Sequence, residues 1–404
     1  MEEIPRNQHS QIMRGNKLKR RKLAFGALLA TSSLFLASCA TDSGELTLTV
    51  PDVPMQQELG EFEGELNIVN WSGFVEPAWT DKFTAETGCK VNPRVAGTSD
   101  EMVTLMRTGE YDIVSASGDA ALRLIVGGDV APLNLDLIPN FSDDIAPGMK
   151  GQIYDTVNGK AYGVPIGRGA NLLQYNETVT GGAPESWSVV WEPDSPYAGK
   201  ITAYDAPIYI ADAAVYLMYH KPELGITNPY ALDETQLAAA VDLLKQQNSI
   251  IGEYWSDPVA QITSFVGGNV VVGTSWEVLR KFAGQENIKT TLPVEGSTGW
   301  YDAWLLSSTA KNPNCAYAWM DYTSTAEVNG AIAMNFGMAP ANIAFCKSSP
   351  EAQAHCDEFA AEDEEFFSRV WPWTTPIEEC VDGRKDVKCT SFQDWTNAWL
   401  TIKG

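Results

Sequence analysis

From residue 65 onward, short apolar segments alternate with segments of helical periodicity, and this order restricts the chain to a small set of α/β folds. Leu66, Ile68 and the next few residues alternate like a strand that Trp71 ends, and a second strand is expected at 90–95. Between them, Glu76-Pro77 has the composition of a helix start, and Gly88 that of a helix end. The pattern therefore predicts a strand, a helix and a second strand.

The same alternation continues to residue 114. Ser99 or Asp100 is expected to cap a second helix that runs to Gly109, and residues 111–114 read as a short buried strand. A β-α-β-α-β order with short connections predicts a parallel sheet.

A second region repeats this organisation after residue 170. Strands are expected near 172–173, at 201–204 and at 269–273, and Asp233 with Gln236 predicts the capped start of a helix. Neither region has a Gly-rich phosphate loop. Two similar α/β halves predict two lobes that face each other across a cleft, with ligands at the carboxyl ends of the strands.

The first residues predict export from the cytoplasm. A basic stretch, residues 17–22, precedes an apolar run at 23–37 that is too short to span a membrane, and Leu36-Ala37-Ser38-Cys39 resembles a bacterial lipobox. We expect residues 1–38 to be a lipoprotein signal peptide, Cys39 to carry the lipid, and residues 39–64 to form a flexible tether. The alternative is a plain secretory signal followed by a chance cysteine.

Charge and length exclude some functions. The chain has 52 acidic and 28 basic side chains, a formal net charge of −24, and removal of the leader makes it more negative. Such a surface repels nucleic acid and favours cationic solutes. The length suggests two domains, and no later segment approaches a membrane span.

Seven cysteines leave six after lipidation, and an even number in an exported chain favours disulfides over metal ligation. Proximity in sequence suggests a disulfide between Cys346 and Cys356 and another between Cys380 and Cys389. Cys89 would then pair with Cys315. Free buried thiols are the alternative.

Aromatic residues stand near the expected strand ends: Trp71 ends the first strand, and Trp276 follows the strand at 269–273. Trp300, with Tyr301 and Asp302 after it, follows a Gly-flanked break. These segments, with several others in the same order, resemble the spermidine/putrescine-binding proteins. The matching segments are 70–75, 83–88, 111–114, 162–165, 268–276 and 293–302.

The resemblance implies a type II periplasmic binding protein fold, α/β, with two lobes joined by crossing segments. Lobe one would comprise residues 65–168 plus 301–345, and lobe two 169–300 plus 346–404. The tail with four cysteines and Trp371-Pro372-Trp373 departs from the family pattern.

The resemblance also implies a site in which rings stack on the ligand and carboxylates pair with its amines. Trp71, Trp276 and Trp300 would be the walls, Asp302 and Asp205 the amine partners, and Phe74 stands where the family usually has Tyr. Departures fall at Asp119 near Ser117, at Ile208, at Met338 and at Arg168.

Each of these residues also has an alternative interpretation. Any single Trp packs in a core by default, and Asp119 or Asp205 could cap a helix. Arg168 would repel a bare polyamine, so it either clamps a ligand carboxylate or forms a salt bridge between the lobes.

The expected function is therefore that of a lipid-anchored, extracytoplasmic, monomeric solute-binding protein that delivers a polyamine or related amine to the permease of an ABC importer. A ligand that also carries a carboxylate is the alternative. An enzyme, such as a carbohydrate-active one, or a structural lipoprotein is disfavoured, because His220 and His355 are in no catalytic or metal-binding spacing. No metal or cofactor is expected.

Overall fold

The computed structural model describes residues 47–141 and 144–404, and its first elements follow the predicted order. They are β1 (Glu65–Asn70), α1 (Pro77–Thr87), β2 (Lys90–Val95), α2 (Ser99–Met106), β3 (Ile113–Ser117) and α3 (Gly118–Gly127). The strand β1 pairs in parallel with β2 and β3, so the predicted parallel sheet is confirmed. The helix α1 ends at Gly88, whose φ of 77° suits glycine.

Two local predictions in this half are wrong by a few residues. The N-cap of α2 is Thr98, whose hydroxyl accepts the backbone N–H of Glu101, and not Ser99 or Asp100. The third strand begins at Ile113, just after Asp112, whose carboxylate accepts the backbone N–H groups of Asn67, Lys311 and Asn312.

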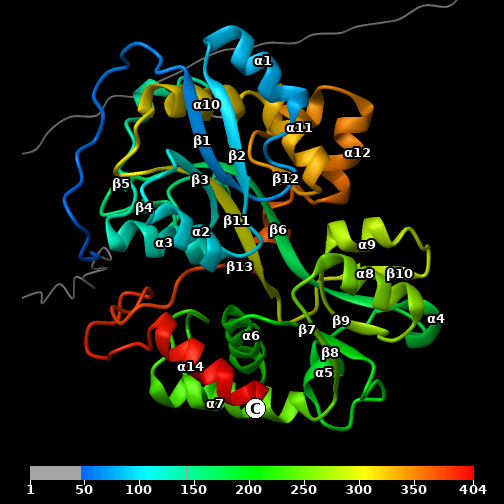
Figure 1. Cartoon of the computed structure of the whole chain (residues 1–404). Helices are drawn as coiled ribbons and strands as arrows, with labels where there is room; N and C mark the ends of the chain where they lie inside the picture. Colours follow the sequence, from blue (N-terminus) through cyan, green and yellow to red (C-terminus); the bar gives the residue numbers. More distant parts are fainter. Residues whose placement is uncertain (1–46, 142–143) are drawn as a thin grey trace, which may run out of the picture. The chain divides into compact units, whose positions relative to one another are not determined.

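One strand joins the two halves of the molecule. Among the described residues an 11-stranded sheet has the order β2-β1-β3-β11-β6-β9-β7-β8, with β10, β12 and β13 attached to its sides. The 14-residue strand β6 (Gly163–Asn176) pairs with β11 up to Ala170 and with β9 from Asn171 onward. Figure 1 shows β6 running from the half that contains β1, β2 and β3 into the half that contains β7, β8 and β9.

The second half repeats the α/β alternation. Its capped helix is confirmed, because Asp233 and Gln236 form a capping box. The strand expected at 269–273 lies at 272–276 instead, since Asn269 still bonds back to Ser264 at the end of the preceding helix. The elements between the two halves and in the second half are η1 (Leu135–Leu137), η2 (Pro147–Met149), β4 (Thr156–Val157), β5 (Lys160–Ala161), α4 (Glu177–Thr180), α5 (Ser188–Trp191), β7 (Ile201–Tyr204), η3 (Pro207–Tyr209), α6 (Ile210–His220), η4 (Pro222–Leu224), α7 (Glu234–Asn248), β8 (Ile251–Trp255), α8 (Pro258–Gly267), β9 (Val272–Trp276), α9 (Glu277–Ala283) and β10 (Ile288–Thr291).

The chain then returns to the first half and ends in the second. The returning elements are β11 (Ser297–Leu306), α10 (Pro313–Ser324), α11 (Ala326–Phe336), β12 (Ala339–Pro340), η5 (Ile343–Lys347), α12 (Pro350–Glu358), α13 (Glu364–Phe367), β13 (Val370–Pro372) and α14 (Phe392–Lys403). The helix α12 packs on η5 and β12, whereas α14 packs on α7. A disulfide ties α12 to η5, while Glu358 at the end of α12 pairs with Arg280 and Lys281 of α9 in the second half. The lobe boundary at residue 346 stays a prediction.

The three predicted disulfides are confirmed. Cys346 is bonded to Cys356 and Cys380 to Cys389, each pair closing a short segment of the tail. Cys89 is bonded to Cys315 across a sequence separation of 226 residues. Both cysteines of this long-range pair are fully buried in the first half.

The prediction of a flexible tether is wrong for residues 47–64, which lie against the body. Leu48 is buried, and its backbone N–H donates to Oδ1 of Asn158 at 2.9 Å. Nearer the first strand, the Glu63 carboxylate accepts the backbone N–H groups of Asn314 and Cys315. These long-range bonds order a segment whose composition alone resembles a linker. Residues 1–46, which include the expected signal peptide and Cys39, lie outside the described residues.

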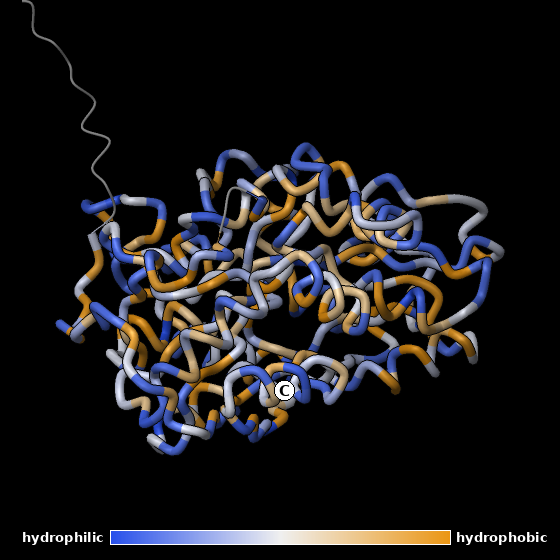
Figure 2. The backbone as a smooth tube through the Cα atoms, turned by 90° about the horizontal axis from the view of Figure 1, so that it is seen from above, coloured by the Kyte–Doolittle hydropathy of each residue, from blue (hydrophilic) through white to orange (hydrophobic). Residues whose placement is uncertain are grey.

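The core is continuous through both halves. Apolar side chains of β1, β6, β11 and α10 form one cluster with those of α6 and α7. In Figure 2 the hydrophilic stretches of the tube gather at the outer turns. Within residues 47–141 and 144–404, none of the helices is long and apolar enough to cross a membrane.

Candidate functional site

A cavity of about 270 Å³ lies where strands of both halves end. Trp71 follows β1, Ser117 ends β3, and Trp300 and Asp302 lie in β11. Its other lining residues are Ser72, Val95, Ala96, Gly97, Ser99, Tyr204, Ser256, Pro258, Trp276, Phe336 and Trp373. In an α/β fold the carboxyl ends of strands are the usual place for a ligand, so this cavity is the candidate site.

Aromatic rings make up much of the cavity wall. Trp276 and Trp300 meet edge to face with centroids 6.3 Å apart, and Trp300 meets Phe336 in the same way at 5.6 Å. Tyr204 packs on Trp276 and stacks on Trp373 at 5.8 Å with an interplanar angle of 19°. Such a box gives a ligand several ring faces and little contact with water.

The Trp300 ring fits in the cavity wall because the residue paired with it on β6 is a glycine and has no side chain. Trp300 is paired with Gly169 across β11 and β6. A Cβ on Gly169 would lie 2.3 Å from the Trp300 ring. Any side chain at 169 would therefore displace this wall of the cavity.

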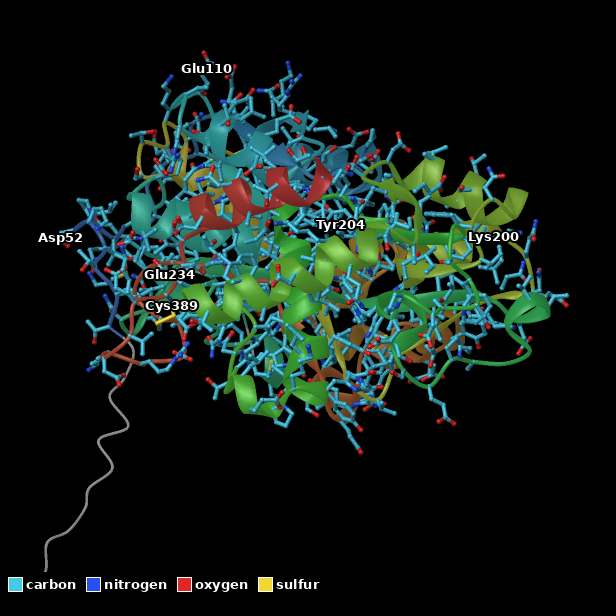
Figure 3. The ribbon with its side chains drawn as sticks, turned by 90° about the horizontal axis from the view of Figure 1, so that it is seen from below. Asp52, Glu110, Lys200, Tyr204, Glu234 and Cys389 are labelled. Carbon is cyan, nitrogen blue, oxygen red and sulfur yellow. A yellow bond between two sulfur atoms is a disulfide. The ribbon has the colours of Figure 1, made fainter. Side chains whose placement is uncertain are left out.

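Trp373, which the sequence analysis did not select, comes from the cysteine-rich tail. Its backbone N–H donates to the carbonyl of Gly299 at 2.7 Å, directly after β13 pairs with β11. The sequence analysis also did not predict Tyr204 and Phe336 as site residues, although Tyr204 ends strand β7 and Phe336 ends helix α11. Tyr204 lies toward the middle of the view in Figure 3, while Asp52, Glu110 and Lys200 lie at the edges. The Trp371-Pro372-Trp373 run was the one available signal.

Among the described residues that line the cavity, Asp302 is the single carboxylate. It is 2% exposed, and Ser117 donates its hydroxyl to Oδ1 at 2.6 Å. The pairing of β11 with β6 shifts register between Asp302 and Ala303, a bulge of the kind that redirects side chains near functional sites. Burial raises the pKa of Asp302 to about 7, and the nearby Asp119 adds to the rise. A bound cation would favour its ionised form.

Asp119 lies behind Ser99, which lines the cavity, and does not line it itself. The Ser99 hydroxyl donates to Oδ1 of Asp119 at 2.9 Å. Burial raises the pKa of Asp119, although Arg123 opposes the rise. The alternative role of N-cap is excluded by the structure: α3 begins at Gly118, so Ser117 holds the N-cap position.

Asp205 and Phe74 are not part of the lining either. The carboxylate of Asp205 accepts the indole N–H of Trp399 at 3.2 Å and the ammonium of Lys403 at 3.0 Å, so it holds the last helix. Phe74 is fully buried and packs edge to face on Phe336 at 4.8 Å. It therefore supports a wall of the cavity from behind.

Arg168 also lies outside the lining. Its guanidinium donates to Oε1 of Glu364 at 2.7 Å and lies over the ring of Phe367 at 3.6 Å. Arg168 was expected either to bind a ligand carboxylate or to form a salt bridge. The structure contains the salt bridge, and its partner Glu364 belongs to the short helix α13 of the tail.

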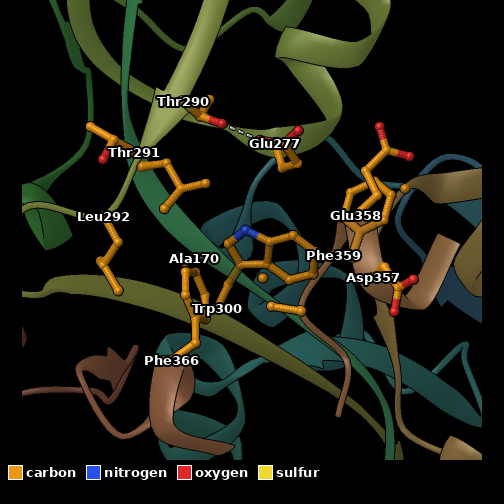
Figure 4. Close-up of a pocket in the computed structure, with 14 residues that line it drawn as sticks. Ala170, Glu277, Thr290, Thr291, Leu292, Trp300, Asp357, Glu358, Phe359 and Phe366 are labelled. Carbon is orange, nitrogen blue, oxygen red and sulfur yellow. Dashed lines mark hydrogen bonds between the residues drawn. The ribbon is translucent and has the colours of Figure 1, made fainter. Parts of the chain in front are cut away.

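A second cavity, of about 350 Å³, also has Trp300 in its lining. Figure 4 shows Thr290 and Glu277 joined by a hydrogen bond above the Trp300 ring, with Glu358 and Phe359 beside it. The carboxylates of Glu277 and Glu358 are already paired with Arg280. The third carboxylate of the lining, Asp357, is exposed and accepts the side-chain amide of Gln353. Among the described residues this cavity therefore offers a ligand no free buried carboxylate comparable with Asp302. Within the part of the chain that the structure describes, His, Cys, Asp and Glu form no group suited to hold a metal ion.

The family model described as bacterial extracellular solute-binding protein matches residues 78–357, which is more than half of the chain. The chain belongs to this family. Members of the family are solute-binding proteins, so the cavity between the strand ends belongs to a binding protein. The predicted family is confirmed, and so is the predicted fold class.

Relatives of this solute-binding protein carry polyamine names. The spermidine/putrescine-binding periplasmic protein of Escherichia coli K12 is 26% identical over 293 residues, 71% of this chain and 80% of that protein. Spermidine/putrescine-binding periplasmic protein 1 of Haemophilus influenzae is 24% identical over 291 residues, which are 70% of this chain and 77% of that protein. Among solved structures, the spermidine/putrescine ABC transporter substrate-binding protein PotD of Streptococcus pneumoniae has a TM-score of 0.68 at 22% identity. It covers 84% of this chain and 98% of its own.

Proposed function

We propose that this monomeric protein captures a small solute with ammonium groups, of the putrescine or spermidine class, and delivers it to the permease of an ABC importer. The observation that carries the proposal is the buried carboxylate of Asp302 inside a box of aromatic rings. Each ring face attracts an ammonium by roughly 0.5 to 2 kcal/mol. The cation would also supply the counter-charge that the buried Asp302 lacks. The names of the relatives support the same class of solute.

The lining favours an amine over a ligand that also carries a carboxylate. No Lys, Arg or His is among the described residues that line the cavity, and Arg168 is already paired with Glu364. A buried ligand carboxylate would then have no counter-charge, and an unpaired buried charge is costly. The neutral lining outside Asp302 also offers no pairing of a nucleophile with a histidine base, so we propose binding without catalysis.

A matched pair of ligands tests this proposal. Putrescine and 4-aminobutyrate have chains of similar length, but the second replaces one ammonium with a carboxylate. Titration calorimetry at pH 8 should give binding of putrescine, with spermidine as a longer member of the class, and much weaker binding of 4-aminobutyrate. Equal or tighter binding of 4-aminobutyrate would support the carboxylate-bearing alternative, and no binding of any amine would contradict the proposal.

Trp373→Ala should weaken putrescine binding by about tenfold, because one ring face of the box is lost. The tail supplies a matched control in Trp371→Ala, since Trp371 is two residues away and does not line the cavity. Calorimetry on the two variants should therefore give a clear loss for Trp373 and little change for Trp371. Similar losses in both would mean that the tail acts through folding and not through contact with the solute.

We also propose that the protein is anchored outside the cytoplasm through a lipid on Cys39. Cys39→Ala should move the protein from the membrane fraction to the soluble fraction of exported protein, since a single residue carries the attachment. Ser43→Ala, four residues on, is the control and should leave the protein with the membrane. Retention of the Cys39 variant in washed membranes would contradict the lipobox interpretation.

A further inference from the structure

A buried chain of three hydrogen bonds ends on one ring of the cavity. The indole N–H of Trp276 donates to Oδ1 of Asn171 at 2.9 Å. The amide nitrogen of Asn171 donates to the hydroxyl of Thr298 at 2.6 Å, and that hydroxyl donates to Oδ2 of Asp212 at 3.0 Å. Asn171 is 6% exposed, Thr298 0% and Asp212 9%, so water does not replace these bonds.

The chemistry of the four groups fixes the direction of this chain. The indole N–H can only donate, so Asn171 must turn its oxygen toward Trp276 and its nitrogen toward Thr298. The hydroxyl of Thr298 then has its hydrogen available for Asp212, whose carboxylate accepts. All three bonds run the same way, an arrangement in which each bond strengthens the next.

Trp276 differs in this respect from the other tryptophans of the cavity. Among the described residues, the indole nitrogens of Trp71, Trp300 and Trp373 are buried without a hydrogen-bond partner. Their positions depend on packing alone. Trp276 packs edge to face on Trp255 and Trp300 as well, but ring contacts of this kind leave freedom to slide, which a directed hydrogen bond removes.

The three supporting residues come from three separate elements. Asn171 lies on β6 and Thr298 on β11, the two strands that connect the halves and pair at Ala170 and Gly299. Asp212 lies on α6 of the second half. None of the three lines the cavity, so any effect they have on a ligand must pass through Trp276.

We infer that the hydrogen-bond chain from Asp212 through Thr298 and Asn171 positions the Trp276 ring to receive the solute. Asp212, Thr298 and Asn171 are thus positioning residues of the binding site. The inference rests on the proposed function in that the ring is held for a solute. Its geometrical part concerns the protein without ligand, and the two parts are measured separately.

The central test removes one hydroxyl and then restores it. Thr298→Val keeps the shape of the side chain and breaks the chain, whereas Thr298→Ser keeps the hydroxyl. In ligand-free protein labelled with ¹⁵N, the indole N–H signal of Trp276, assigned by its loss in Trp276→Phe, should shift in Thr298→Val and return in Thr298→Ser. Putrescine affinity should fall about tenfold in the first variant and recover in the second.

A double-mutant cycle separates positioning from a general effect on the core. Because Phe has no N–H, Thr298→Val should cost no further affinity in a Trp276→Phe background. Asp212→Val and Asp212→Asn form a second pair, in which the first removes the terminal acceptor and should behave like Thr298→Val, while the second retains an oxygen and should not.

The outcomes distinguish the two proposals. An unshifted Trp276 signal in both Thr298→Val and Asp212→Val, or an equal loss of affinity in the Trp276→Phe background, would overturn the inference. If the signal shifts as expected but the wild-type protein binds no amine, the hydrogen-bond chain stands and the proposed function fails.

Discussion

Asp302→Asn is expected to weaken putrescine binding by about a hundredfold or more at pH 8, because it removes the one carboxylate of the cavity and leaves its shape unchanged. The same change should stabilise the empty protein. Burial raises the pKa of Asp302 from 3.8 to about 7, so the ionised carboxylate is disfavoured in the folded state. The folded state loses stability from this group as the pH rises from 3.8 to about 7, because over this range the unfolded chain has released a proton that the folded protein retains.

Two measurements check this prediction, titration calorimetry for binding and thermal unfolding for stability. At pH 8, the unfolding temperature of the empty Asp302→Asn protein should exceed that of the wild type, by an amount that corresponds to a few kcal/mol at most. Wild-type affinity should fall up to tenfold for each pH unit below about 7, while the affinity of the variant should change little with pH.

Asp155 provides the control for the pH dependence. Burial raises its pKa to about 7 as well, yet it does not line the cavity. Asp155→Asn should therefore change the pH dependence of stability without changing that of binding. Unaltered putrescine affinity in a folded Asp302→Asn protein would remove Asp302 from the site, and only the solute-binding fold would remain.

Removal of the Cys89–Cys315 disulfide is expected to lower the free energy of unfolding by about 5 kcal/mol, since a cross-link over 226 residues strongly restricts the unfolded chain. The double variant Cys89→Ala with Cys315→Ala should show this loss in urea unfolding. At temperatures where it stays folded, its putrescine affinity should be close to that of the wild type, because neither cysteine lines the cavity.

The tail contains the matched comparison. Cys380 and Cys389 are separated by 9 residues, so their removal as Cys380→Ala with Cys389→Ala should cost only about 2 to 3 kcal/mol. Equal losses in the two double variants would show that local packing, and not closure of the long loop, determines the contribution of the Cys89–Cys315 bond.

The order of elements was readable from the sequence because strand and helix periodicity are local properties. The helix that begins at Pro77 and ends before Gly88, and the capping box of Asp233, depend on residues within a few positions of each other. The walls Trp71, Trp276 and Trp300 were predicted from the resemblance to the spermidine/putrescine-binding proteins, and all three line the cavity, although Trp300 lies within β11 and not at a strand end.

Other features depend on partners far along the chain and could not be read locally. Arg168 binds Glu364, 196 residues further along the chain, and Asp205 binds Lys403, 198 residues further along. Both partners belong to the tail that the family pattern does not cover, so the sequence could not show that Arg168 and Asp205 are held outside the cavity. The segment at 47–64 resembled a linker for the same reason, because its ordering partners, such as Asn314, lie some 250 residues away. Trp373, which lines the cavity, belongs to the same tail and could not be predicted for the same reason.

The position of β11 between β3 and β6 has a consequence for the order in which the protein can fold during synthesis. The strand β3 lacks its neighbour β11 until residue 306 is available, although β1, β2 and β3 are complete by residue 117. Cys89 likewise cannot form its disulfide until Cys315 has been synthesised. The amino-terminal third of the chain therefore leaves the ribosome well before the strand and the cysteine that complete its native arrangement are available.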